Sequence, residues 1–170
     1  MSWLWPNATS TSEVDWDAVY ARELPRIYNY FRYRIGDDAV AEDLTSATFE
    51  KAWRARDSYR RDAAKFSTWL YAIARNVAID HFRRSGRELP LESAADVATG
   101  STPEDEVLRT GDLDRLELLM AGLGEREREL LAFKYGAELT NREIAKVTKL
   151  SESNVGTILH RAVATLRSRW

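Results

Sequence analysis

Apolar residues recur along this chain at helical spacing, and no long alternating pattern of the kind that marks a β-strand is present. The stretch KFSTWLYAIARNVAIDHFRR, residues 65–84, shows this spacing most clearly. The apolar stripe that predicts the buried side of a helix here consists of Phe66, Leu70, Ile73 and Val77. We therefore expect an all-α fold.

Residues that start and stop helices divide the rest of the N-terminal half. Ser12 with Asp15 is placed to cap a first helix. Pro25 is expected to restart a helical stretch that ends at Gly36, because proline is disfavoured inside a helix. A further helix is expected over residues 39–56, after an aspartate cap, and the basic loop DSYRRDAA follows it.

The amino-acid composition changes in the middle of the chain, where helical periodicity is lost and Ser, Ala, Thr, Pro and acidic residues predominate. We expect two small helical domains, residues 1–87 and 112–170, joined by an acidic linker over residues 88–111. A helix is expected to restart at Thr102-Pro103. The second domain is near the size at which a core is marginal, so we expect it to lean on a partner for stability.

The segment LTNREIAKVTKLSESNVGTILHRAVATL has the form of a helix-turn-helix. Thr140 and Glu143 make a capping box for a short helix, and Leu150-Ser151 supplies the turn. In the next helix one side is apolar, with Val155, Ile158, Leu159, Ala162 and Leu166. The other side carries Ser153, Thr157, His160, Arg161 and Ala164. Short polar donors with an arginine suit the major groove of DNA, and a plain helical hairpin is the alternative.

The net charge of −2 conceals strong segregation. Residues 1–50 carry −5 and residues 88–125 carry −8, whereas residues 51–87 carry +7 and residues 126–170 carry +4. Two basic lobes separated by an acidic strip indicate two contacts with a polyanion. Ordinary solvated faces are the alternative for either lobe alone.

The helix over residues 65–84 also carries candidate nucleic-acid contacts. Trp69, Asn76 and Arg83 recur every seven residues along one edge of it, and Arg75 is expected on its outer side. Further basic residues near one end are Arg60, Arg61 and Lys65. Aromatic and cationic side chains along an edge suit single-stranded nucleic acid. Alternatively, Trp69 packs inward and Asn76 is a polar residue at the rim of the core.

The preceding helix has an exposed stripe that could dock a protein or form ordinary solvated surface. It consists of Asp43, Ser46, Ala47, Glu50 and Arg54. Elsewhere the chain offers little for catalysis: it has no cysteine, its two histidines lie far apart, and no nucleophile–base pair or phosphate-binding loop is evident. We expect no enzyme activity, no metal and no cofactor. No apolar run approaches the roughly 20 residues of a membrane helix, so no membrane insertion is expected.

Three segments, AEDLTSATFEKAW, KFSTWLYAIARNVAIDHFRR and LTNREIAKVTKLSESNVGTILHRAVATLR, occur in an order and spacing that identify a family. Over about residues 15–168 the chain resembles bacterial sigma factors of the extracytoplasmic-function group. The resemblance implies a cytoplasmic specificity subunit of RNA polymerase that supports transcription initiation. Its implied partners are the two largest core subunits, promoter DNA and an anti-sigma factor. A free-standing helix-turn-helix regulator and a sigma-like interaction protein are the alternatives.

The resemblance also implies roles for particular residues. The polymerase-binding set is Asp43, Ser46, Ala47, Phe49, Glu50 and Trp53, with Ser46-Ala47 standing where the family usually has Gln-Glu. The set for the minus-ten element is Arg60, Arg61, Lys65, Ser67, Trp69, Arg75, Asn76, Arg83 and Arg84. The set for the minus-thirty-five element is Arg142, Ser153, Asn154, Thr157 and Arg161. Ala72-Ile73 replaces the paired tryptophans of housekeeping members, which implies weaker melting and stricter promoter choice.

Overall fold

The computed structural model describes residues 14–60, 65–88 and 111–170, and within those ranges all regular structure is helical. The N-terminal unit consists of α1 (Trp16–Ile35), α2 (Asp38–Arg54), the short 3₁₀ turn η1 (Arg56–Ser58) and α3 (Phe66–Glu88). The C-terminal unit consists of α6 (Asp112–Ala121), α7 (Glu125–Leu131), η2 (Ala132–Gly136), α8 (Asn141–Thr148) and α9 (Glu152–Arg169). The all-α prediction is confirmed. The acidic linker and the helix expected at Thr102-Pro103 fall outside the described residues.

α1 is a single helix, so the prediction that Pro25 restarts a helical stretch is wrong. Asp15 caps the helix by accepting a hydrogen bond from the Ala18 amide at 3.2 Å, and Gly36 ends it with a φ of 79°. Pro25 removes the hydrogen bond to the carbonyl of Ala21. Both residues are exposed, so water can satisfy that carbonyl and the helix continues.

The helix-turn-helix forms as its local signals predict. The Thr140 hydroxyl accepts from the Glu143 amide at 3.1 Å, and the Glu143 carboxylate accepts from the Thr140 amide at 3.1 Å. This completes the capping box of α8. The turn begins one residue earlier than expected, at Lys149, whose φ of 62° lies in the left-handed region. Ser151 then caps α9 by accepting from the Asn154 amide at 3.0 Å.

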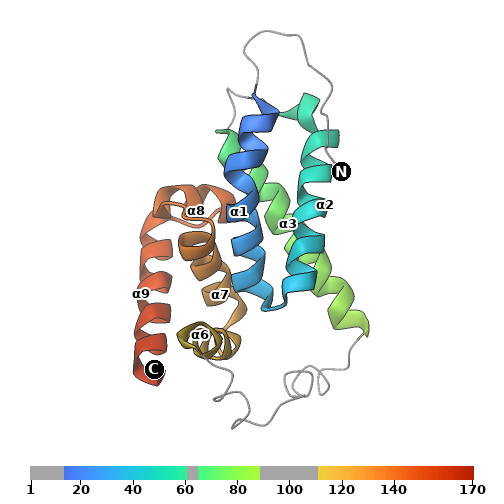
Figure 1. Ribbon diagram of the computed structural model, residues 1–170. Coiled ribbons are helices and arrows are strands. Elements are labelled where there is room, and N and C mark those ends of the chain that lie inside the picture. The colour runs from blue at the N-terminus through green and yellow to red at the C-terminus, as the bar shows by residue number, and fades with distance from the viewer. Residues whose placement is uncertain (1–13, 61–64, 89–110) are drawn as a thin grey trace.

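The two units pack directly against each other, with α1 lying between α2 and the C-terminal unit (Figure 1). One contiguous apolar core runs through both units. Of the stripe expected to be buried on α3, Leu70 and Val77 are buried, whereas Phe66 and Ile73 are half-buried. The small C-terminal unit therefore packs on the first unit of its own chain, and its dependence on that unit for stability stays a prediction.

The contact between the units is centred on η2. The Phe133 ring is fully buried and stacks on Tyr30 of α1, with ring centroids 4.5 Å apart. It also meets Tyr71 of α3 edge-on at 6.3 Å. A Cβ added at Gly136 would lie 2.9 Å from the carbonyl oxygen of Asn29, so glycine permits this close approach of η2 to α1. No described helix is long and apolar enough to cross a membrane.

Candidate functional site

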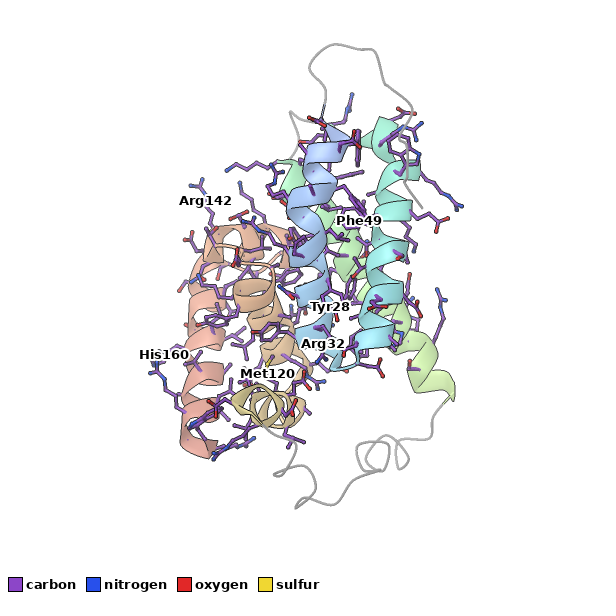
Figure 2. All side chains as sticks on the ribbon, in the orientation of Figure 1. Tyr28, Arg32, Phe49, Met120, Arg142 and His160 are labelled. Carbon is purple, nitrogen blue, oxygen red and sulfur yellow. The ribbon has the colours of Figure 1, made fainter. Side chains whose placement is uncertain are left out.

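The polar face of α9 is exposed along its length. Ser153, Asn154, Thr157 and Arg161 are all exposed, as is His160 beside them. The opposite side is packed into the core, where Val155, Leu159 and Ala162 are buried. Figure 2 shows His160 pointing away from the N-terminal unit, and Arg142 on the neighbouring α8 does the same. α9 therefore presents an unobstructed face with a basic flank, the arrangement that a recognition helix needs.

The outer face of α3 offers a second candidate surface. Asn76, Arg83 and Arg84 are exposed on it, and Arg83 lies 3.9 Å from the Asp80 carboxylate. Lys65, just before α3, is exposed, as is Arg60. Ser67 is half-buried, and Arg61 lies outside the described residues. Asn76 and Arg83, seven residues apart, bring an amide and a cation onto one side of α3.

Trp69 belongs to an aromatic cluster rather than to that surface. Its ring centroid lies 6.3 Å from Trp16, 5.3 Å from Tyr59 and 5.5 Å from Phe66. Helical spacing alone could not decide whether Trp69 packs in the core or contacts nucleic acid. Packing against Trp16 of α1 and against Tyr59, which follows η1, makes Trp69 a half-buried support for the start of α3.

Arg75 does not lie on the outer side of α3, so that expectation is wrong. Its Nε donates to the Glu129 carboxylate on α7 of the other unit, and its side chain is only 25% exposed. The reason is tertiary, because Glu129 lies 54 residues away in the sequence and is brought to α3 by the packing of α7.

The stripe on α2 is exposed as expected at Asp43, Ser46 and Glu50, whereas Ala47 is half-buried. Beside it lies a groove of about 300 Å³, lined by Tyr20, Leu24, Ser46, Phe49, Glu50, Trp53 and Arg54. Phe49 is 6% exposed and packs edge-on against Tyr20, so it forms the floor of the groove rather than an exposed contact. Figure 2 places Phe49 between α1 and α2.

Two buried tyrosines contribute structure rather than titratable chemistry. Burial raises the pKa of Tyr71 far above its ordinary value, and Glu23, which accepts the phenol's hydrogen bond at 2.8 Å, raises it further. Burial likewise raises the pKa of Tyr30. Both phenols therefore stay neutral at physiological pH. The described residues contain no group of His, Cys, Asp and Glu side chains that could hold a metal ion.

Sequence reasoning missed the acidic residues of the C-terminal unit that face the N-terminal unit. Glu129 is 4% exposed and lies between Arg75 and Arg34, with an oxygen 3.8 Å from the Arg34 guanidinium. Glu117, which is much more exposed, pairs with Arg32 of α1. A local signal existed, because Glu129 directly precedes the apolar run LLAF, where a buried carboxylate demands a cation.

Comparison with known proteins places both units. The family model for sigma-70 region 2 matches residues 19–88, and the model for sigma-70, region 4 matches residues 113–166. The extracytoplasmic-function (ECF) RNA polymerase sigma factor BldN of Streptomyces coelicolor is 32% identical over 87% of this chain, which spans 57% of that protein's length. The ECF sigma factor SigL of Mycobacterium tuberculosis is 31% identical over 88% of this chain and 85% of its own.

A solved structure supports the fold. The sigma factor RpoE of Bartonella quintana, crystallised with the anti-sigma factor NepR, superposes with a TM-score of 0.72. The alignment covers 91% of this chain and 95% of that one at 21% identity, which shows a shared fold.

Proposed function

Because this chain belongs to the extracytoplasmic-function group of RNA polymerase sigma factors, we propose that it binds polymerase core and directs it to promoter DNA. In this role the chain supplies binding and specificity, and the polymerase supplies the catalysis. It is not itself an enzyme, and it acts in the cytoplasm with the polymerase.

The polymerase-binding surface is the exposed side of α2 with its groove. Asp43, Ser46 and Glu50 supply its polar contacts, and Trp53 lines the apolar part. Ser46-Ala47 lacks the acid that the family usually has, and Glu50 offers a carboxylate one turn further on. Glu50 is paired with Arg54 at 2.6 Å, but an ion pair this exposed is weak and leaves Glu50 available to a partner. The partner on this side is the coiled coil of the largest core subunit.

The minus-ten strand is held on the outer face of α3. Asn76 supplies an amide that can pair with a base edge, and Lys65, Arg83 and Arg84 supply cations for the phosphates. Unstacking a base costs a few kcal/mol, so capture of the flipped base on this face must offset that cost. Trp69 supports this face from inside the aromatic cluster.

The minus-thirty-five element is read by α9, and this assignment carries the proposal. The observation behind it is the fully exposed polar face of a capped α9, backed by a buried apolar side. Arg161 reaches the groove or a phosphate, and Ser153, Asn154 and Thr157 lie nearer the helix start, where base contacts usually fall. Arg142 on α8 is placed to contact the phosphate backbone of the DNA. The C-terminal unit rests on the flap of the second-largest core subunit.

An anti-sigma protein is a further proposed partner. RpoE of Bartonella quintana, which shares this fold, was crystallised with the anti-sigma factor NepR. We infer that this chain is also regulated by sequestration.

Run-off transcription with polymerase core and a random promoter library tests the proposal. We expect the chain to enrich a bipartite promoter and to bind it well only in complex with core. Tight duplex binding by the isolated chain, without transcription, would identify a free-standing regulator instead. No effect on DNA in either state would leave an interaction protein.

A further inference from the structure

The interface between the two units is electrostatically one-sided. In each ion pair that joins the units across the described residues, the arginine belongs to the N-terminal unit and the glutamate to the C-terminal unit. The pairs are Arg26–Glu138 at 3.5 Å, Arg34–Glu129 at 3.8 Å, Arg32–Glu117 and Arg75–Glu129. The C-terminal unit thus presents carboxylates to a basic surface, as a polyanion would present phosphates.

Glu129 is the centre of this interface. One carboxylate oxygen accepts from Arg75 Nε, and the other lies 3.8 Å from Arg34 and 3.9 Å from Arg126. The Glu129 and Arg34 side chains are each 6% exposed. A carboxylate buried to this extent requires cations, and the arginines in turn require an anion.

Departure of the C-terminal unit would leave the two arginines together. Arg34 lies on α1 and Arg75 on α3, and both helices belong to the packed N-terminal unit. Without Glu129, two guanidinium groups face solvent at one place. The Arg34 Nε finds no acceptor among the described residues in the closed chain, so a phosphate, which has more oxygens than a carboxylate, suits the pair better.

We propose that Arg34 and Arg75 form a DNA-phosphate site that Glu129 occupies in the closed chain, so that closure of the two units and DNA binding compete. The proposal adds Arg34 to the DNA-contacting residues and makes the C-terminal unit an internal competitor of the promoter strand. It rests on the proposed function, because the anion that displaces Glu129 is the DNA that a sigma factor binds.

The interface between the units is packed unevenly. A cavity of about 340 Å³ lies between α1 and α6, lined by residues that include Tyr28, Arg32 and Met120 (Figure 2). This volume far exceeds the share of a single water, about 30 Å³, so the α6 end of the interface has room for solvent. The tight end is at Gly136, where an added Cβ would meet the Asn29 backbone, which cannot swing aside as a side chain can.

Closure is measured first, without DNA. The chain has no cysteine, so Ala39→Cys on α2 and Ser168→Cys on α9, both at exposed positions, accept a donor and an acceptor dye for energy transfer. We expect Glu129→Gln and Gly136→Ala to lower the transfer efficiency. Gly122→Ala is the matched control, because its added Cβ would meet its nearest neighbours at an ordinary 3.5 Å. Unchanged transfer in Glu129→Gln would overturn the proposal, even if Gly136→Ala fails to fold by circular dichroism.

DNA binding is measured next, with a fluorescein-labelled single-stranded oligonucleotide of mixed sequence and the full chain. We expect Glu129→Gln to bind it roughly fivefold or more tightly than wild type. Adding Arg34→Gln should abolish that gain while the units stay open. Adding Arg126→Gln should preserve it, because Arg126 also lies near Glu129 but belongs to the departing unit. A gain that survives Arg34→Gln, or no gain at all, would refute the phosphate site.

The experiments distinguish failure of the proposed sigma-factor function from failure of the proposed phosphate site. Linkage requires that the oligonucleotide itself lower energy transfer in the wild-type chain. Suppose that the oligonucleotide lowers energy transfer but core polymerase shows no transcription with the chain. The competition between closure and DNA binding is then supported, and the proposed promoter role is refuted. If wild type supports transcription while Glu129→Gln changes neither transfer nor DNA affinity, the internal competitor falls alone.

Discussion

Replacing Phe133 with alanine tests whether the two units unfold together. The Phe133 ring is fully buried, stacked on Tyr30 and edge-on to Tyr71, both from the N-terminal unit. A buried Phe→Ala change typically costs about 3–5 kcal/mol, from lost transfer energy and the cavity left behind. If the units form one cooperative structure, this loss lowers the stability of both.

The size of the effect is large enough to measure by urea denaturation. A loss of about 4 kcal/mol, divided by a urea dependence of about 2 kcal/mol/M, moves the unfolding midpoint down by about 2 M. Two probes separate the units. Five of the six tryptophans precede residue 70, so tryptophan fluorescence reports mainly on the N-terminal half, whereas far-ultraviolet circular dichroism reports on all helices.

Phe133→Ala should shift both midpoints together, although Phe133 itself lies in the C-terminal unit. Leu118→Ala is the control, because Leu118 is 46% exposed and its truncation should move neither midpoint appreciably. A fluorescence midpoint that stays in place while circular dichroism shows an earlier transition would refute the reasoning. The units would then be stable independently, and the stack on Tyr30 would contribute little.

Four further substitutions test the assigned surfaces. Asn76→Ala should impair open-complex formation more than core binding, because Asn76 is exposed on the outer face of α3; equal losses in both assays would remove it from the strand site. Arg161→Ala should weaken binding to the minus-thirty-five element by about 1–3 kcal/mol if it reads a base, or flatten the salt slope by about one unit if it meets a phosphate, and no change in either would exclude it. Ala47→Glu should tighten core binding in a competition assay by restoring the family's acid, and no gain would show that acid to be dispensable. Thr140→Ala should lower thermal stability by about 1 kcal/mol through loss of the α8 cap, and Thr140→Ser should recover most of it if the hydroxyl is responsible.

The sequence-based expectations are most accurate for features that depend on residues close together in the chain. The α8 capping box, the Ser151 cap and the inward side of α9 were all predictable, because each depends on residues three or four positions apart. The same reasoning wrongly predicted a helix boundary at Pro25, through which α1 continues. A helix boundary inferred from proline assumes that the freed carbonyl is unsatisfied, and exposure to water removes that penalty at this position.

The candidate surfaces divide in the same way. Asn76, Arg161 and Glu50 lie on exposed faces as helical spacing predicts. Phe49 and Trp69 pack against aromatic partners on α1 and beyond, so Phe49 is buried and Trp69 is half-buried. Spacing along one helix defines a face but cannot say which neighbouring element covers it.

The sequence alone determined the all-α class, the caps of α8 and α9 and the family resemblance, since these follow from local periodicity and from motifs in a fixed order. The tertiary structure alone decided what the charged residues between the units do. Arg75 was expected to face outward, and Glu129, 54 residues away, takes its guanidinium instead. Such an ion pair cannot be predicted from periodicity along the chain, because it depends on how two helical units pack against each other.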